Sequence, residues 1–505
     1  MGKPNYTLDE PRDGSDPIYQ RIERMILREV DRGTLKEGDR LPSVRALAND
    51  LNVNAVTVSR AYRELSRRGI LTGRGRGGTV IAHTSAKRHA SSSRPIDPSM
   101  AEISHLRTVT GNRAFQQMLA ASQSEHLIQL TKAYPSSDLV WTPDVHKTFR
   151  DVSRKAGPEL FEYTSSAGSL DLRRAILVYV SAQGMEATTD EIIITSGAQQ
   201  GLDIVTRTLM RAGDKIIMER PTYFGMLDLL RSSGIQPVTV EMLNDGVSPE
   251  ALEEAIVTHG PKAFYTMPTF HNPAGVTQSL ERRRQVVEIC ARYNLPIIED
   301  DYAPELRFSG EPLPTLWSLA REEGNSCSVF YVRGFSKTYL PGVRLGFVLV
   351  PRSEYENVLS SRSLSTLHSS NLVQLFGVAY FKSEVWLSVR DQLVKTYSKR
   401  QSALVKSLKS NLPRTARILA PDGGLNVWLH LPDEIDATEM FYTAIRNGVS
   451  YFAGELFFAD KPALNTMRVS FGALSEAEIP DAAARLGATV SQQMGEKAPS
   501  VTMVL

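Results

Sequence analysis

Residues 328–346 read SVFYVRGFSKTYLPGVRLG, and this stretch decides the fold class of the longer, C-terminal part of the chain. It opens with an apolar run, Ser328–Val332, which is typical of a buried strand. Lys337 follows that strand in a loop of small residues, and Arg344 stands seven positions later. A lysine held in this way is suited to Schiff-base chemistry with a carbonyl compound. The arginine can reach the same space and pair with a phosphate dianion.

Apolar segments alternate with amphipathic helical segments from about Tyr163 onward. The strands that we predict are Ile192–Thr195, Lys215–Glu219, Pro237–Glu241, Ala263–Met267, Pro296–Glu299, Ser328–Val332 and Leu345–Val350. Short buried strands separated by helices indicate an α/β fold with a mostly parallel sheet and helical crossovers.

The ends of three predicted strands carry the residues that a pyridoxal phosphate site needs. After Ile192–Thr195, the small residues of Ser196–Gly201 open a helix whose backbone N–H groups can cradle a phosphate. Asp300 follows Pro296–Glu299, and a carboxylate there can keep a pyridine nitrogen protonated, which makes the ring an electron sink.

Three further side chains could hold the cofactor ring. Asn272, after the strand Ala263–Met267, and Tyr302 can donate to the phenolic oxygen, while Tyr223 can stack on the ring. Each motif also has a plainer interpretation. Asp300 could belong to a helix N-cap with Asp301, and the two tyrosines could be half-buried aromatics. Arg468, which lies in the run Met467–Phe471, could form a surface ion pair. His271 is expected to shape its loop and to take no part in catalysis. The order of five independent motifs favours the cofactor site.

Together these residues resemble the fold-type I pyridoxal-phosphate-dependent aminotransferases over roughly residues 115–488. The resemblance implies that Lys337 forms the internal aldimine and that Asp300 pairs with the pyridine nitrogen. It also implies a smaller C-terminal α+β subdomain. The catalytic residues would be Lys337, Asp300 and Tyr302, and the other cofactor-binding residues would be Asn272, Tyr223, Ala198, Gln199, Arg344 and Tyr163.

The resemblance assigns two special roles and reveals one departure. Tyr163 looks like the tyrosine that reaches the phosphate of the partner subunit, and Arg468 looks like the arginine that binds an α-carboxylate. Gly334 departs from the pattern, because many relatives have Ser or Thr three residues before the lysine. One phosphate-binding hydroxyl is therefore expected to be missing. No metal site is expected.

The N-terminal part has a different pattern. A predicted helix from Ile18 to about Arg32 precedes a short helix capped by Ser43, and a further helix runs from about Val56 to Arg68. Two short strands then flank a Gly/Arg loop within Gly69–Val80. The DNA-contacting residues that we predict are Arg45, Thr57, Ser59, Arg60, Arg63 and, in the loop, Arg74 and Arg76.

The runs Leu41–Ala48 and Val56–Leu65 resemble the GntR family of winged helix-turn-helix repressors, which implies double-stranded DNA as a partner. Charge supports this interpretation. The basic residues between positions 60 and 88 are Arg60, Arg63, Arg67, Arg68, Arg74, Arg76, Lys87 and Arg88. The only acid in that stretch is Glu64, so a polyanion is the expected partner although the net charge of the chain is only +2.

A chain of 505 residues with 42% hydrophobic and 23% charged residues is expected to form more than one globular domain. We predict a reader domain over 14–83, a linker over 84–112, an effector domain over 113–490 and a tail over 491–505. Two cysteines exclude a disulfide framework. Because a signal core and a membrane-spanning apolar run are both lacking, we expect a cytoplasmic protein without a membrane partner.

A GntR-type reader followed by an aminotransferase-like domain resembles the MocR subfamily, which implies a homodimer. We expect a transcription regulator that binds pyridoxal phosphate through Lys337 and senses either the cofactor itself or a small amino compound. The alternative is a working aminotransferase with an accessory DNA-binding domain, and the sequence leaves turnover undecided.

Overall fold

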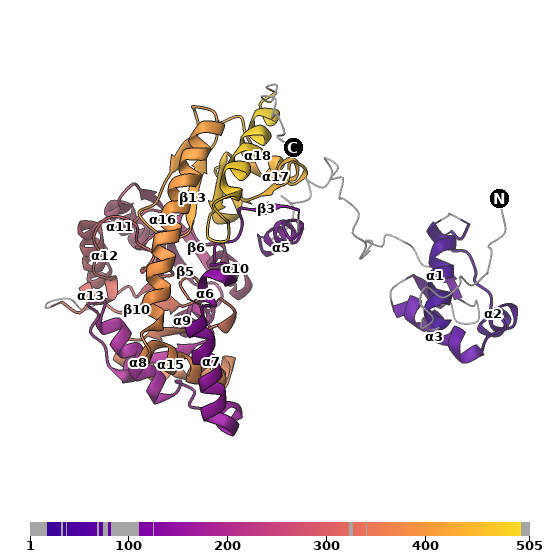
Figure 1. Ribbon diagram of the computed structural model, residues 1–505, viewed down its shortest axis with the longest axis horizontal. Helices are drawn as coiled ribbons and strands as arrows, with labels where there is room; N and C mark the ends of the chain where they lie inside the picture. Colours follow the sequence, from indigo (N-terminus) through magenta and orange to yellow (C-terminus); the bar gives the residue numbers. More distant parts are fainter. Residues whose placement is uncertain are drawn as a thin grey trace. The chain divides into compact units, whose positions relative to one another are not determined.

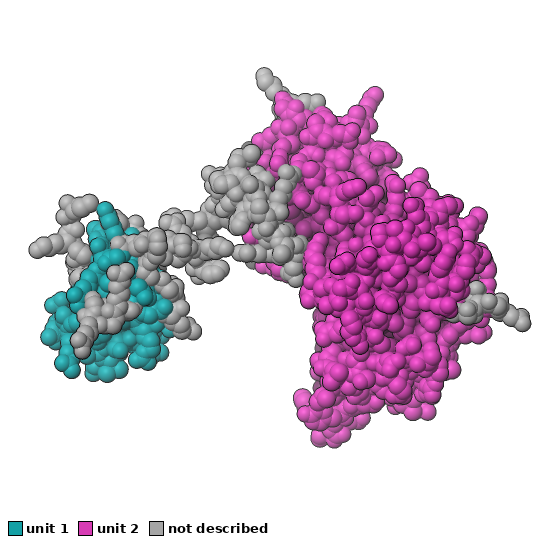
Figure 2. Space-filling view, turned by 180° about the vertical axis from the view of Figure 1, so that it is seen from behind, with its two compact units in different colours: residues 1–97 teal, residues 98–505 magenta. Residues whose placement is uncertain are grey.

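The computed structural model describes residues 18–31, 34–36, 38–67, 70–73, 79–81, 111–124, 126–322, 327–339 and 341–495. The chain divides into two compact units, residues 1–97 and 98–505, which are coloured separately in Figure 2. None of the described helices is long and apolar enough to cross a membrane.

The described part of the first unit, hereafter the reader, contains three helices and an antiparallel pair of strands. Its elements are α1 (Ile18–Asp31), α2 (Val44–Asp50), α3 (Ala55–Arg67), β1 (Leu71–Gly73) and β2 (Thr79–Ile81). The buried side chains are Ile22, Met25 and Ile26 in α1 and Val58, Ala61, Tyr62 and Leu65 in α3, whereas Ile18 at the start of α1 is 44% exposed. The helix-turn-helix pattern and the two wing strands are therefore confirmed.

The second unit, hereafter the effector domain, is built around an eight-stranded sheet in the order β4-β11-β10-β9-β8-β5-β6-β7. The strands are β4 (Ile192–Thr195), β11 (Gly346–Leu349), β10 (Val329–Gly334), β9 (Ile297–Asp300), β8 (Ala263–Thr266), β5 (Lys215–Arg220), β6 (Gln236–Leu243) and β7 (Gly246–Val247). Five neighbouring strands, from β10 to β6, run parallel, whereas β11 is antiparallel to both of its neighbours. All seven predicted strands are present.

Helices cover both faces of the sheet (Figure 1). The effector domain's helices before the C-terminal layer are α5 (Gly111–Ala121), α6 (Ser137–Val140), α7 (Pro143–Ala156), α8 (Leu170–Ser181), α9 (Ala198–Leu209), α10 (Phe224–Ser233), α11 (Pro249–His259), α12 (Leu280–Arg292), α13 (Leu316–Leu319), α14 (Tyr355–Ser365) and α15 (Asn371–Lys382). Side-chain caps fix several of their starts, as at Ser248 of α11 and Ser279 of α12.

A smaller C-terminal layer completes the effector domain. Helices α16 (Val385–Asn411), α17 (Ala437–Arg446) and α18 (Glu478–Gln493) accompany a four-stranded antiparallel sheet. Its strands are β12 (Arg417–Leu419), β13 (Asn426–His430), β16 (Thr466–Ser470) and β15 (Phe452–Ala453). A separate parallel pair joins β14 (Val449–Ser450) to β3 (Ile128–Gln129). The expected α+β subdomain is therefore present.

The register of the large sheet places the predicted motifs at one edge, where the parallel strands have their C-terminal ends. Thr195, Gly346 and Gly334 are aligned across β4, β11 and β10, and Val332 pairs with Asp300 of β9. Because β11 is antiparallel, the residues before it lie at the edge where its neighbours end. The antiparallel strand thus brings Arg344 to the same edge as Asp300 and the turn after β10.

Candidate functional site

The turn of the reader is held by two specific hydrogen bonds. Ser43 caps α2 by accepting from the Ala46 N–H at 3.2 Å. The Tyr62 hydroxyl of α3 donates to the Pro42 carbonyl at 2.8 Å, which ties α3 to the start of α2. Arg45, the second residue of α2, is exposed and free to approach a phosphate backbone.

The outward face of α3 carries the other predicted DNA contacts. Arg63 is exposed, and Thr57 and Ser59 are half-buried. Arg60 is also exposed, but its guanidinium lies 4.0 Å from the centroid of the Tyr19 ring in α1. Sequence patterning does not reveal that contact, because Tyr19 and Arg60 are far apart in the chain. Arg74 and Arg76 of the predicted wing lie outside the described residues.

Val56, near the start of α3, is a candidate contact that sequence reasoning missed. Its side chain is 73% exposed, although an apolar residue at the start of an amphipathic helix is normally read as a packing position. An exposed aliphatic side chain at the N-terminal end of a recognition helix can contact a thymine methyl group. The signal that identifies Val56 is its exposure in the folded domain, which the sequence pattern does not show.

In the effector domain, Asp300 ends β9 and is only 2% exposed. The Tyr265 hydroxyl of the neighbouring strand β8 donates to Asp300 Oδ2 at 2.9 Å. Asp300 Oδ1 is buried with no hydrogen-bond partner among the described residues. Burial, and to a lesser degree the nearby Asp301 carboxylate, raises the pKa of Asp300 to about 7. A buried carboxylate with a free oxygen is a site prepared for a cation or an N–H donor.

Lys337 lies in the turn after β10 and is half-buried. Burial of the amine lowers its pKa to about 8, helped by the positive charges of Arg468 and Arg344 and opposed by Asp300. A lysine with an ordinary pKa of 10.5 would be almost fully protonated at pH 7. The lowered pKa raises the fraction of free, nucleophilic amine at neutral pH by roughly two orders of magnitude.

The N-terminus of α9 forms the phosphate side of the site. Its N-cap is Gly197, with a φ of +98°, and no side chain caps the helix. Arg344 Nη2 donates to the Ser196 carbonyl at 3.3 Å, and a Cβ added at Gly197 would lie 2.7 Å from that nitrogen. The glycine therefore lets the guanidinium approach the open N–H groups of α9. This combination suits a phosphate dianion.

Gly334 has a packing reason for lacking a side chain. A Cβ added there would lie 2.9 Å from the backbone nitrogen of Ala198. The N-terminus of α9 consequently sits directly against the end of β10. Ala198 is half-buried at this contact, and Gln199 is exposed beside it.

Asn272 and Arg468 meet on the opposite side of the site. Arg468 is 3% exposed, so the alternative of a surface ion pair is wrong. Its Nη1 donates to Asn272 Oδ1 at 3.1 Å and its Nη2 to the Thr131 carbonyl at 3.3 Å, whereas Nε is buried without a partner among the described residues. Burial lowers the pKa of Arg468 to about 10.

The two predicted ring-binding tyrosines also face this space. Tyr223 donates to Gln199 Oε1 at 3.2 Å, and burial together with the Asp300 carboxylate raises its pKa to about 12. Tyr302 is 9% exposed, and burial raises the pKa of its hydroxyl above the ordinary value. A Cβ added at Gly424, where φ is +78°, would lie 2.5 Å from the Tyr302 hydroxyl oxygen. Gly424 therefore makes room for Tyr302.

Tyr163 does not join the other site residues within this chain. It is 84% exposed, and its only described ring contact is with His368, at 5.1 Å between centroids. Phe161, two residues earlier, is 86% exposed. This placement leaves the Tyr163 hydroxyl available to a second molecule.

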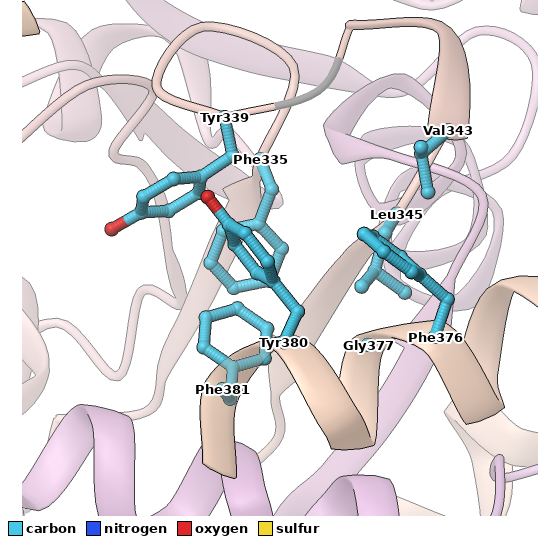
Figure 3. A pocket seen from close by; sticks show the side chains of 8 residues that line it. All are labelled: Phe335, Tyr339, Val343, Leu345, Phe376, Gly377, Tyr380 and Phe381. Atoms are coloured by element: carbon cyan, nitrogen blue, oxygen red, sulfur yellow. The ribbon is translucent and has the colours of Figure 1, made fainter. Parts of the chain in front are cut away.

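Behind the turn of Lys337 lies a small apolar hollow. Phe335 and Tyr339, on either side of that turn, face Tyr380 and Phe381 of α15 (Figure 3). The hollow is separate from the polar groups described above. Its aromatic walls anchor both ends of the segment that carries Lys337.

Three supporting residues were missed by sequence reasoning: Tyr265, Glu219 and Arg333. Tyr265 binds Asp300, and Glu219 of β5 accepts hydrogen bonds from the Thr266 hydroxyl and the Met267 N–H. His271 shapes its loop as expected, since its Nδ1 accepts from the Ala274 N–H at 3.4 Å. Arg333 of β10 donates to the Asp301 carbonyl at 3.1 Å. Tyr265, Glu219 and Arg333 occupy ordinary strand positions, so only the folded arrangement gives these three residues a role.

The residues at this edge fit pyridoxal phosphate. The free oxygen of Asp300 suits the pyridine N–H, the uncapped start of α9 with Arg344 suits the phosphate, and Lys337 supplies a reactive amine between them. Asn272 accepts from Arg468, and the pKa values of Tyr223 and Tyr302 are both affected by the charges of Asp300 and Arg468, so the three side chains lie close to these groups.

Comparison with known proteins gives two matching family models. The model described as aminotransferase class I and II matches residues 127–486. The model described as bacterial regulatory proteins, gntR family, matches residues 18–81.

Similar proteins fall into two groups. The HTH-type transcriptional regulator YdfD of Bacillus subtilis is 27% identical over 476 residues, covering 94% of this chain and 97% of that protein. Aromatic-amino-acid aminotransferase 1 of Thermococcus litoralis is 29% identical over 387 residues, covering 75% of this chain and 91% of that protein. Among solved structures, the α-aminoadipate aminotransferase LysN of Thermus thermophilus, in complex with N-(5'-phosphopyridoxyl)-L-leucine, matches with a TM-score of 0.70 at 26% identity. That match covers 77% of this chain and 100% of LysN.

Proposed function

Since the chain belongs to the aminotransferase class I and II family and joins it to a gntR-family DNA-binding domain, we propose that its effector domain controls transcription by sensing an amino compound. The chain is a GntR-type regulator fused to an aminotransferase domain. The observation that carries the proposal is that Lys337, the buried Asp300 with its unpartnered oxygen and the uncapped start of α9 stand on the same chain as the reader. The arrangement corresponds to the MocR subfamily, and its place of action is the cytoplasm.

The cofactor is pyridoxal phosphate, which supplies an aldehyde that primary amines can join and a ring that withdraws electrons. Lys337 is the residue that binds the aldehyde carbon, and Asp300 holds the proton on the pyridine nitrogen. Arg344 and the N-terminal N–H groups of α9, at Ala198 and Gln199, bind the phosphate. Asn272 and Tyr302 orient the phenolic oxygen, and Tyr223 covers the ring face.

Arg468 selects effectors that carry a carboxylate. Its Nε is buried and without a partner among the described residues, while Nη1 is engaged with Asn272. A carboxylate that pairs with the guanidinium would satisfy Nε and relieve the cost of leaving a buried donor unpaired. Two different contacts, one to the amine and one to the carboxylate, would therefore define an amino acid or a related amino compound.

The aromatic cluster around Arg468 gives the signal a route to the reader. The Arg468 guanidinium carbon lies 5.1 Å from the Phe452 ring centroid and 5.8 Å from that of Phe224. Phe115 of α5 packs against both rings, at centroid distances of 5.2 and 4.4 Å. α5 is the first described element after the last strand of the reader, β2. Movement of Arg468 toward a carboxylate would therefore be felt at the helix where the chain enters the effector domain.

We propose a homodimer as the working form. Tyr163 is exposed on its own subunit, which suits the role of reaching a phosphate bound by the partner subunit. A two-fold dimer also presents two readers, which matches paired or repeated DNA half-sites.

The proposal is tested by measuring DNA binding and effector binding on the same samples. Fluorescence anisotropy with DNA from upstream of the protein's own gene gives the first, and the visible absorbance of the bound cofactor during titration with amino acids gives the second. We expect Phe115→Ala to keep the absorbance response and lose the change in DNA affinity. Gln116→Ala, at an exposed position of the same helix, is the matched control and should behave like wild type. An unchanged DNA response in Phe115→Ala would eliminate the proposed route.

A second function, sustained transamination, is favoured by one observation. Lys337 has a pKa of about 8 beside Asp300, so its amine can accept and return a proton at neutral pH, as a general base must. Incubation of the protein with amino-acid and keto-acid pairs tests this function directly. Many turnovers per subunit would make the chain an enzyme, whereas conversion of no more than one equivalent per subunit supports sensing.

A further inference from the structure

Arg333 is a fully buried cation that the cofactor site does not itself use. It belongs to β10, is 0% exposed, and forms an ion pair with Glu305. Burying a charged guanidinium is unfavourable unless its donors are well satisfied. Nε of Arg333 is buried without a partner among the described residues, so the acceptors of Nη1 and Nη2 indicate what the residue is for.

The Nη1 donor of Arg333 joins two turns of the site. It donates to the Asp301 carbonyl at 3.1 Å, to the Tyr302 carbonyl, and to the Gly334 carbonyl at 2.8 Å. The first two carbonyls immediately follow Asp300, and the third begins the turn that carries Lys337. One guanidinium thus fixes the backbone on both sides of the gap between the carboxylate and the amine.

The Nη2 donor reaches the far side of Lys337. It donates to Glu305 and, at 3.2 Å, to the hydroxyl of Thr338, which is 0% exposed and directly follows Lys337. Arg333 therefore contacts the turn both before and after the lysine. Glu305 in turn accepts from the Tyr179 hydroxyl, which orients the carboxylate toward Arg333.

The opposite side of the same turn is held by apolar packing. Phe335 and Tyr339 sit in the aromatic walls of the hollow seen in Figure 3. The Phe335 N–H also donates to the Leu345 carbonyl at 2.9 Å, next to Arg344. Apolar contacts alone leave rotation of the turn open, whereas the planar fork of Arg333 fixes it through directed bonds.

We propose that Arg333, supported by Glu305, is a positioning residue that sets the placement of Lys337 relative to Asp300 and thereby the cofactor's affinity and protonation. A lysine side chain in place of Arg333 would keep the positive charge but could not form the same planar fork. The inference rests on the proposed role of Lys337.

The test measures two properties of the cofactor-loaded protein: the dissociation constant for pyridoxal phosphate and the pH midpoint of its visible absorbance. The groups that act on Lys337 are Asp300 of β9, Arg344 before β11 and Arg468 of β16. We expect Arg333→Lys to weaken cofactor binding by about tenfold and to lower the midpoint by about one pH unit, because a displaced Asp300 stabilises the protonated form less.

Thr338→Val tests the same contact with less risk to folding, since it removes only the hydroxyl acceptor in a side chain of equal size. Thr338→Val should also lower the pH midpoint, by a smaller amount than Arg333→Lys does. Arg173→Met is the control, because Arg173 donates to the Thr189 carbonyl at the opposite end of β4. A purely structural role for Arg333 predicts lowered thermal stability in Arg333→Lys and Arg173→Met with no change of midpoint in either.

Different outcomes test the role of Lys337 and the positioning role of Arg333. If the visible absorbance of wild type equals that of Lys337→Ala, the proposed role of Lys337 is wrong, whatever Arg333 does. If wild type has lysine-dependent absorbance but Thr338→Val and any folded Arg333→Lys keep the wild-type midpoint and affinity, the positioning role is wrong and the proposed function stands.

Discussion

Replacing Asp300 by asparagine should stabilise the cofactor-free effector domain and weaken its response to the cofactor. In the cofactor-free protein, burial raises the pKa of Asp300 from its ordinary value of 3.8 to about 7. An acid with a raised pKa in the folded state opposes folding at any pH where the unfolded form would be ionised. One pKa unit corresponds to about 1.4 kcal/mol, so the cost approaches about 4 kcal/mol at pH 8 and falls below about 1 kcal/mol at pH 4.

Asparagine has nearly the same shape and can still accept from Tyr265, but it carries no charge. We therefore expect Asp300→Asn to raise the free energy of unfolding of the cofactor-free protein at pH 8, by at most about 4 kcal/mol, and to change it little at pH 4. With pyridoxal phosphate present, wild type should instead be the more stable protein, because Asp300→Asn loses a charged partner for the pyridine nitrogen. A hydrogen bond to a charged group contributes about 1.5–3 kcal/mol, which corresponds to roughly ten- to hundredfold in cofactor affinity.

Urea denaturation followed by tryptophan fluorescence measures both effects. All four tryptophans, Trp141, Trp317, Trp386 and Trp428, belong to the effector domain, so the signal reports on that unit alone.

Glu299→Gln is the matched control for this experiment. Glu299 is the neighbouring buried acid, but it accepts from the Leu316 and Trp317 N–H groups instead of facing the site. Its substitution should leave the stabilisation by cofactor unchanged. The reasoning about Asp300 is refuted if Asp300→Asn destabilises the cofactor-free protein equally at pH 4 and pH 8, or if it gains as much stability from the cofactor as wild type does.

Three further predictions concern the amine, the carboxylate and the DNA. The rate of cofactor uptake by cofactor-free protein should rise with pH, reach half of its maximum near pH 8, the pKa of Lys337, and level off above that pH; a rate that is flat from pH 6 upward in stopped-flow absorbance would contradict this. Arg468→Gln should weaken a carboxylate-bearing effector by at least about tenfold while leaving the corresponding decarboxylated amine unaffected, as measured by absorbance titration. Arg45→Ala and Arg63→Ala should each reduce the slope of log affinity against log salt concentration by about one for every phosphate that the arginine neutralises, and an unchanged slope in an anisotropy titration would remove that arginine from the interface.

Much of the fold is predictable from sequence because its signals are local. The seven strands are short apolar runs, such as Ile192–Thr195, bounded by turn residues, and each is recovered to within about two residues. Strand direction is not local. The sequence gives no sign that β11 runs antiparallel to its neighbours, although this reversal brings Arg344 to the edge where Asp300 lies.

The residues of the candidate site also fall into those that local sequence patterns reveal and those that they do not. Motif residues such as Lys337, Asp300 and Asn272 stand out because each lies at the end of a strand or shortly after one. Arg333 and Tyr265 do not, since they occupy regular strand positions and acquire a role only through neighbours on other strands. For Arg60, the helical periodicity correctly predicts exposure but is silent on its contact with Tyr19, which depends on how α1 packs against α3.

The central claim is that the cofactor site controls DNA binding, and one measurement addresses it most directly. The affinity of wild type and Lys337→Ala for DNA from upstream of the gene is compared with and without pyridoxal phosphate and an amino compound that alters the absorbance of the wild-type holoprotein. The account predicts competitor-resistant binding by both proteins and a ligand-dependent change in affinity that is lost in Lys337→Ala. Equal ligand responses in the two proteins, or only weak and sequence-independent binding by wild type, would contradict it.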